Sequence, residues 1–461
     1  MLKINDKNIY FPDQQTIAVL RDNISTSHID EIKKYIYDKD LNVTQTKNKL
    51  RTAFENFSPF TVHIFPTSDC NLRCKYCFSD AGEIRSCKLS KTQIDTILCQ
   101  GAKSMVMANM VTNQEAPPFE VWFGGGGEPT FEWELFCYTI DRAKFYAEKF
   151  NYKVKFGLLT NGTLYEPEKL KYIVDNITYV QISYDGIPYI QNMHRPTAKG
   201  ENSFLLVDSF VKFIMRNNKH FALRATVSDI SVKYLEDITE FFCTNYPSSS
   251  HIHFEPLTIT DRSQRMKFNS PSPSEFIENF LKAMRVGKKY NKSVLTSTMA
   301  LIDKRDNDSF CDAMVGDTIM LQPNGYLTTC YEAMPYELDD YSIFKAGAIS
   351  FDGAIKWNND RNINQLNLNN DRCKKCYCWD FCKGGCAIIK YRGEDGYKYR
   401  CKVTKQLTLR LLKILSDENL LCKYRLFPHI ILCEDNPYIE KIIRWDETVM
   451  GTKTSRLSAF N

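Results

Sequence analysis

The chain lacks the hydrophobic segments that would direct it to a membrane or across one. Its first residues, MLKINDKNIYFPDQQ, contain no continuous apolar core of the kind found in secretory signal peptides. No run approaches the roughly 20 apolar residues that a membrane-spanning helix needs. We therefore expect a cytoplasmic protein without a membrane partner.

Long runs of like charge, internal repeats and low-complexity tracts are also missing. The 60 basic and 55 acidic residues leave a net charge of +5, spread along the chain without a basic block. So mild an excess does not indicate a nucleic-acid-binding protein, and we expect no nucleic-acid partner. With 461 residues and 43% hydrophobic content, the chain can form a large core in two or three domains.

Cysteine, in contrast, is abundant. The chain has 17 cysteines, an odd number, and without an export signal this favours metal sites over a disulfide framework. Cys70, Cys74 and Cys77, which we call the cysteine triad, have the spacing C-x3-C-x2-C in TSDCNLRCKYCFSDAG. Structural zinc and iron–sulfur sites take four protein ligands. Three thiolates without an obvious fourth indicate a metal site with a vacancy, although zinc binding or free thiols remain alternatives.

With Tyr76 before its last cysteine, the triad resembles that of the radical S-adenosylmethionine (SAM) enzymes. The resemblance implies that a [4Fe–4S] cluster binds the triad and that the amino and carboxylate groups of SAM bind the fourth iron. A glycine-rich segment, FGGGGEPTF, follows at 123–131. By resemblance to the GGEP stretch of the family, Gly126, Gly127 and Glu128 would meet the methionine amino group of SAM.

Further polar residues at predicted strand ends match the family. Asn161 lies in TNG, Ser183 in ISYDG, and Arg195 follows His194. By resemblance, Asn161, Ser183 and Arg195, together with Tyr76, are candidates for binding SAM through its ribose and carboxylate. Alternatively, such residues cap helices or pair locally.

The pattern from residue 61 predicts an α/β fold. Six apolar segments alternate with helical stretches such as 91–109 and 234–246, which indicates a parallel sheet. Six strands in about 200 residues fit a partial (β/α)6 TIM-like barrel, with the site at the C-terminal ends of the strands. The predicted strands are 61–69, 119–125, 153–162, 179–186, 222–228 and 252–258.

Seven more cysteines follow residue 310 with a regular spacing: Cys311, Cys330, Cys373, Cys376, Cys382, Cys386 and Cys401. They resemble the SPASM domain of peptide-modifying radical SAM enzymes, which carries two auxiliary [4Fe–4S] clusters, whereas a zinc ribbon is the alternative. The resemblance implies one cluster on the four-cysteine set, Cys373, Cys376, Cys382 and Cys401. It implies a second cluster on the three-cysteine set, Cys311, Cys330 and Cys386.

The three-cysteine set is one thiolate short. Asp317 stands where fully ligated relatives have a cysteine. Asp317 or Cys378 would supply the fourth ligand, or the iron would be open to a substrate thiolate. The remaining cysteines follow no metal spacing and are expected to be small buried hydrophobes: 87, 99, 137, 243, 422 and 433.

These features divide the chain into four predicted parts. Residues 1–60 form a small N-terminal unit, a possible peptide-recognition element. Residues 61–305 form the radical SAM partial barrel with a linker, 306–405 the SPASM domain and 406–461 a helical extension.

The resemblance implies an enzyme that cleaves SAM reductively to a 5′-deoxyadenosyl radical, which abstracts hydrogen from a peptide. We expect three [4Fe–4S] clusters, SAM, a precursor peptide and a reductant such as a flavodoxin or ferredoxin. The expected product is a thioether or carbon–carbon crosslink in a ribosomally made peptide, with Asp317, Tyr331 and Glu332 as candidate catalytic groups.

Two other functions remain open. An anaerobic sulfatase-maturating enzyme would have an acidic residue directly after the second SPASM cysteine, but Tyr331 follows Cys330 here. An iron–sulfur electron-transfer protein would not need the glycine-rich segment at 123–131.

Overall fold

The structure is a computed structural model of the whole chain. It describes most residues between 60 and 417 and short segments near both ends. The described residues are 2–3, 8–11, 16–21, 28, 30–32, 34, 60–84, 86–112, 117–299, 310–311, 318–333, 342–358, 371–417, 429–432 and 439–444. Among these residues, no helix combines the length and the apolar character that crossing a bilayer requires.

The six predicted strands form the centre of one parallel sheet, which confirms the expected α/β fold. They pair in chain order, so that each strand lies beside its predecessor. Their bounds are β4 (Thr61–Ile64), β5 (Phe119–Phe123), β6 (Val154–Thr160), β7 (Tyr179–Ser183), β8 (His220–Val227) and β9 (His251–Pro256).

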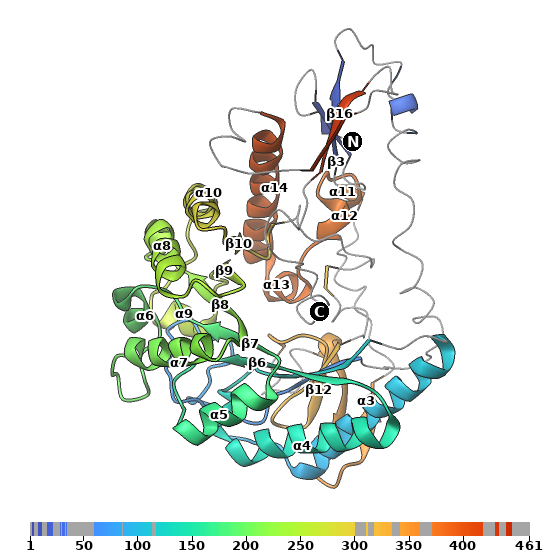
Figure 1. The fold of residues 1–461 in the computed structure, drawn as a ribbon, viewed down its shortest axis with the longest axis vertical. Coiled ribbons are helices and arrows are strands. Elements are labelled where there is room, and N and C mark those ends of the chain that lie inside the picture. The colour runs from blue at the N-terminus through green and yellow to red at the C-terminus, as the bar shows by residue number, and fades with distance from the viewer. Residues whose placement is uncertain are drawn as a thin grey trace.

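Alternate residues of these strands face opposite sides of the sheet. Val62 and Ile64 of β4, like Phe221 and Leu223 of β8, belong to the main hydrophobic core. This face is covered by helices, which lie along one side of the sheet in Figure 1. The opposite face, which we call the inner face, carries the intervening residues, among them His63. The helices are α3 (Lys91–Thr112), α4 (Trp133–Phe150), α5 (Pro167–Asn176), α6 (Pro188–His194), α7 (Phe204–Arg216) and α8 (Leu235–Asn245).

The sheet continues beyond the predicted barrel at both ends. β10 (Ser293–Leu295) pairs with β9, and β11 (Thr318–Leu321) pairs in parallel with β4. Three antiparallel strands then complete an 11-stranded sheet: β12 (Tyr326–Thr328), β13 (Lys345–Ile349) and β14 (Ile355–Trp357). The predicted boundary at 305/306 therefore does not divide the sheet, because the strands after it hydrogen-bond to the free edge of β4.

The remaining helices lie mostly in the second half of the chain. They are α9 (Asp261–Arg265), α10 (Pro273–Lys289), α11 (Asp371–Lys374), α12 (Trp379–Cys382), α13 (Ala387–Arg392) and α14 (Glu394–Ser416). Short 3-10 turns occur at Pro129–Phe131, Val232–Tyr234 and Ser342–Phe344.

A second sheet joins the two ends of the chain. Its order is β1 (Leu2–Lys3), β2 (Asn8–Phe11), β3 (Thr16–Leu20), β16 (Ile439–Arg444) and β15 (His429–Leu432), all antiparallel. Figure 1 shows it at the end of the molecule opposite α4 and α5. The predicted N-terminal unit and C-terminal extension meet in this sheet, and the extension contains the end of α14 as well as β15 and β16. Pairing with β16 satisfies the backbone of β3, which the sequence of either segment alone does not reveal.

Candidate active site

The cysteine triad lies in the loop after β4, and its three thiols are half-buried. The Arg73 guanidinium shapes this loop by donating to the carbonyls of Cys70 (2.8 Å) and Gly82 (2.8 Å). The Lys75 backbone N–H donates to the His194 carbonyl (2.9 Å) at the end of α6. The loop is therefore held both by its own side chain and by the helix after β7.

Among the described residues, no three cysteine, histidine or acidic side chains are arranged as metal ligands, and burial keeps the Cys70 and Cys74 thiols of the triad protonated in this structure. Burial raises the pKa of the Cys74 thiol to about 11, and the Arg195 guanidinium opposes this effect. Burial, followed by the neighbouring Cys74 thiol, also raises the pKa of Cys70. Arg195 Nη1 lies 3.7 Å from Cys74 Sγ. Metal coordination replaces the thiol proton, and the donors around the loop then stabilise the thiolates.

The glycine-rich turn packs directly on the triad loop. A methyl group at Gly127 would lie 2.4 Å from the Asp69 carbonyl oxygen and 2.6 Å from that of Thr67. The Glu128 backbone N–H donates to the same Asp69 carbonyl (2.9 Å), and Ser79 Oγ donates to the Gly126 carbonyl (2.7 Å). The backbones of these two predicted motifs form one structural unit.

Glu128 anchors the end of β6. Its buried carboxylate accepts hydrogen bonds from Thr130 Oγ1 (2.8 Å), Thr160 Oγ1 (2.8 Å) and the Asn161 backbone N–H (2.8 Å). Burial raises the pKa of Glu128, while these hydrogen bonds oppose the rise. Asn161 Nδ2 in turn donates to Asn71 Oδ1 (3.0 Å) in the triad loop. Both predicted SAM ligands thus lie beside the triad and already bind protein groups.

Asp185 brings several predicted residues together. Its fully buried carboxylate lies 3.0 Å from His194 Nδ1 and 3.0 Å from Arg195 Nε, and it accepts from the Tyr76 hydroxyl and the Thr226 backbone N–H (2.9 Å). Burial alone would raise the pKa of Asp185, but Arg195 and the hydrogen bond from His194 outweigh burial and hold the pKa below its usual range. One carboxylate, which follows β7, therefore fixes residues from the triad loop, from α6 and its C-terminal end, and from β8.

Ser183 lies on the inner face at the end of β7. It is half-buried, and in the parallel pairing its partner on β8 is Arg224. Asn161 and Ser183 therefore lie at the C-terminal ends of the neighbouring strands β6 and β7, where sites of parallel α/β sheets form, and Asn161 contacts the triad loop.

Replacing Asp185 with asparagine is expected to lower the stability of the fold. The change leaves the buried Arg195 charge unpaired, and removing one partner of a buried pair costs about 3–5 kcal/mol. For a domain of this size we expect a midpoint decrease of roughly 6–10 °C, measured by anaerobic circular dichroism. Because the pKa is depressed in the fold, the wild type keeps this contribution above the unfolded pKa near ~4 and loses it as pH falls further.

The matched control is Asp175→Asn. Asp175 pairs with Lys171 one helical turn away, and both side chains are exposed by more than half. Exposed pairs contribute little, so the midpoint should stay near that of the wild type. An Asp185→Asn midpoint equal to that of the control would contradict the role given to Asp185.

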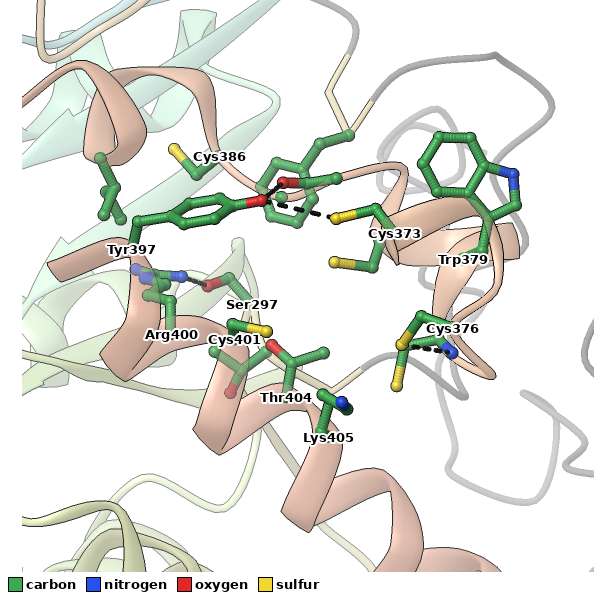
Figure 2. Close-up of a pocket in the computed structure, with 17 residues that line it drawn as sticks. Ser297, Cys373, Cys376, Trp379, Cys386, Tyr397, Arg400, Cys401, Thr404 and Lys405 are labelled. Carbon is green, nitrogen blue, oxygen red and sulfur yellow. Dashed lines mark hydrogen bonds between the residues drawn. The ribbon is translucent and has the colours of Figure 1, made fainter. Parts of the chain in front are cut away.

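The four-cysteine set lines one pocket, together with Cys378 and Cys386. Figure 2 shows Cys373, Cys376 and Cys401 around this pocket, with the Tyr397 hydroxyl 3.8 Å from Cys373 Sγ. Hydrogen bonds from Cys378, with Lys405 and Arg372 nearby, lower the pKa of Cys376. Thiols in this number, with cationic neighbours, suit an iron–sulfur cluster.

The members of the three-cysteine set act on one another electrostatically, although they do not form a metal-binding group among the described residues. Burial, followed by the neighbouring Cys386 thiol, the Glu332 carboxylate and the Cys311 thiol, raises the pKa of Cys330. Cys378 is fully buried and packs against Cys376 and Cys382, so the structure places it with the four-cysteine set rather than as a fourth ligand here. Asp317 lies outside the described residues.

The two described catalytic candidates have different surroundings. The Tyr331 hydroxyl contacts the His63 ring on the inner face, and its own ring stacks on Phe65 at 5.6 Å. The Glu332 carboxylate pairs with Arg392, which also donates to the Glu332 carbonyl (2.8 Å).

Sequence reasoning missed the inner-face residues of the barrel. His63 is mostly buried and stacks on Trp122 of β5 at 5.9 Å. His253 and Glu255 occupy the same face of β9. The available signal was the period-2 alternation in TVHIF, in which His63 and Phe65 alternate with core residues.

The cysteines without metal spacing are less buried than expected. Cys243 is buried, whereas Cys87, Cys99 and Cys137 are half-buried. Cys422 and Cys433 lie outside the described residues.

Comparison with known proteins agrees with this geometry. A family model of the radical SAM superfamily matches residues 64–242. The chain is 24% identical over 345 residues to a cysteine-type anaerobic sulfatase-maturating enzyme of Clostridium novyi, covering 70% of this chain and 86% of that enzyme. It is 22% identical over 426 residues to the radical SAM cyclopropyl synthase TigE of Paramaledivibacter caminithermalis, covering 85% and 84%.

Solved structures share the fold. Native anSMEcpe with bound AdoMet superposes with a TM-score of 0.59 at 20% identity, over 77% of this chain and 98% of that one. Streptococcus suis SuiB bound to S-adenosylmethionine gives 0.52 at 12% identity, over 86% and 98%. The family implies a [4Fe–4S] cluster and SAM. The protein is therefore an enzyme whose residues 64–242 form a radical SAM domain, and it is related both to sulfatase-maturating enzymes and to peptide maturases.

Proposed function

We propose that this enzyme crosslinks a ribosomally made precursor peptide through a thioether or carbon–carbon bond. Bound to the triad, a [4Fe–4S] cluster with SAM supplies a radical able to take hydrogen from an unactivated carbon. Two auxiliary clusters, on the four-cysteine and three-cysteine sets, would accept the electron that the substrate gives up. A flavodoxin or ferredoxin would supply electrons to the triad.

The chain's own residues hold the reactants in place. Arg195, fixed by Asp185, presents a cation beside Cys74, where the SAM carboxylate would bind. Gly126 and Gly127 bring backbone groups against the triad loop, and Asn161 and Ser183 lie at adjacent strand ends. Such fixed positions favour hydrogen abstraction because the substrate carbon is held in reach of the radical.

The Tyr331–His63 contact is the observation that favours crosslinking over sulfatase maturation. A sulfatase-maturating enzyme, by resemblance, would have a carboxylate where Tyr331 stands. Here the hydroxyl contacts His63, and the next residue, Glu332, is engaged by Arg392. The inner face therefore presents aromatic and imidazole groups, which suits the burial of a peptide side chain between two cofactor sites.

A peptide partner is supported by the relatives. SuiB has been solved with its precursor peptide SuiA, and anSMEcpe with the Kp18Cys peptide. The sheet of β1–β3, β15 and β16 would serve as the recognition element, because its edge strands β1 and β15 can accept a further strand from a leader segment.

Formylglycine formation in a sulfatase is the second candidate. It is favoured by the 24% identity to the Clostridium novyi enzyme, which exceeds the 22% identity to TigE. The electron-transfer alternative is not supported, since the relatives of this chain are enzymes.

One assay separates the two candidates. The reconstituted protein is incubated anaerobically with SAM and dithionite, and either with a cysteine-containing precursor peptide encoded beside its gene or with a sulfatase-motif peptide. We expect the precursor to lose two hydrogen atoms and to fragment as a crosslinked product in tandem mass spectrometry. A hydrazide-reactive aldehyde on the sulfatase peptide, without a crosslink in the precursor, would overturn the proposal in favour of the second candidate.

A further inference from the structure

We propose that the buried pair Arg400–Glu255 sets the reduction potential of the auxiliary cluster site and links it electrostatically to the barrel. The inference rests on the proposed function only in requiring that the cysteine pocket holds an iron–sulfur cluster. Neither residue belongs to a predicted motif. Glu255 lies on β9 of the parallel sheet, whereas Arg400 precedes Cys401 on α14.

Arg400, Glu255 and Ser297 form a closed set of polar contacts. Arg400 Nη2 forms an ion pair with Glu255 Oε1, and Arg400 Nη1 donates to Ser297 Oγ (2.5 Å). Ser297 Oγ donates to Glu255 Oε1 (2.7 Å). The Arg400 side chain is 15% exposed and that of Glu255 is 9% exposed. Both charges are thus largely removed from water. Salt screens the interactions of such buried charges only weakly.

On one side, Arg400 faces the cysteines. Arg400 and Ser297 line the pocket that Cys386 and Cys401 also line, and Figure 2 shows them on the same side of it. Arg400 Nε is buried and has no hydrogen-bond partner among the residues that the structure describes. The guanidinium therefore keeps a donor that sulfur atoms of a cluster could engage.

On the other side, Glu255 faces the barrel. Its Oε2 lies 3.0 Å from Nε2 of His253, which is on the same face of β9. His253 is paired in register with Arg224 of β8, and Arg224 with Ser183 of β7. Polar inner-face residues thus lead from the predicted SAM site to the cysteine pocket.

Charge decides the direction of each effect. Reduction adds a negative charge to a cluster, and potentials depend on net charge and on hydrogen bonds to the sulfurs. The Arg400 cation favours the reduced state of the cluster. The Glu255 carboxylate partly cancels this effect of Arg400. Loss of Arg400 should therefore lower the potential, and loss of the Glu255 charge should raise it. A pair that only held the fold together would not give opposite signs.

The test is a redox titration of the reconstituted full-length protein, monitored by electron paramagnetic resonance of the clusters that remain in a C70A/C74A/C77A background. We expect R400Q to lower the reduction equilibrium constant at least tenfold, which is about 59 mV for one electron. E255Q should raise it, and R400K, which keeps the charge, should lie close to the background protein. If R400Q does not retain iron, the potentials of E255Q and R400K still show whether the charge of this pair shifts the reduction potential in the expected direction.

The matched control is R410Q. Arg410 lies on the same helix and pairs with Glu278 of α10 at 2.6 Å, but both side chains are about half exposed. Its potential should equal that of the background protein. Shifts of R400Q and E255Q in the same direction, or no shift with full iron content, would overturn the inference. If the C70A/C74A/C77A protein held no iron, the auxiliary clusters of the proposed function would be refuted, and this inference with them.

Discussion

Replacing Cys74 with alanine is expected to reduce the formation of 5′-deoxyadenosine to background. Cys74 is the middle cysteine of the triad, and Arg195 Nη1 lies 3.7 Å from its sulfur. With only two thiolates left, the triad could not hold a cluster in the way that the proposed function requires. The measurements are iron content and chromatographic detection of 5′-deoxyadenosine after anaerobic incubation with SAM and dithionite.

The control for this change is Cys99→Ala. Cys99 is half-buried on α3 and belongs to no metal spacing. Iron content and SAM cleavage should stay at the wild-type level, because a small side chain is removed that belongs to no predicted ligand set. Undiminished 5′-deoxyadenosine from the Cys74→Ala protein would refute the assignment of the triad.

Replacing Gly127 with alanine is expected to lower SAM cleavage by about 100-fold. The added methyl group would lie 2.4 Å from the Asp69 carbonyl oxygen, directly before Cys70. The obstacle is backbone rather than a flexible side chain, so the turn and the triad loop must move apart. A displacement of roughly 1 Å at a reacting centre can cost about 100-fold in rate. Initial rates of 5′-deoxyadenosine formation at saturating SAM measure the loss.

The control is Gly200→Ala. Gly200 has a φ of +80°, but a methyl group there would meet nothing within 4 Å. The change adds backbone strain, on the order of 1–2 kcal/mol, at the tip of a turn whose Thr197 pairs with Leu72 of the triad loop, and it creates no new contact with that loop. SAM cleavage should be nearly unchanged. Equal losses in the two proteins would show that backbone strain, and not the contact with Asp69, explains the effect at Gly127.

Local patterns predicted the centre of the fold well. Each strand from β4 to β9 is a short apolar segment followed by polar residues, and parallel pairing brings those strand ends to one edge. The triad and the glycine-rich turn are adjacent in space because β4 and β5 are neighbours. Their expected role in SAM binding came from the resemblance of these short motifs to the radical SAM family, since the residues of each motif are close in sequence.

Residues whose roles depend on distant partners escaped prediction. Asp185 was visible as a strand-end residue, but its role comes from Tyr76 and Arg195, which reach it from other segments. Likewise, the side chain of Glu255 pairs with Arg400, 145 residues later. A buried charge needs a partner, yet the sequence does not show which one the fold supplies.

The sequence by itself determined the class of chemistry and the parallel α/β centre, because both depend on short spacings and on period-2 patterns that fold locally. Only the tertiary structure decided that β11 extends the sheet beside β4 and that β16 joins β3. It also decided that Cys378 lies with Cys376 and Cys382. These arrangements follow from pairing free strand edges and burying side chains between remote segments, and such long-range choices leave no periodic signal in the chain.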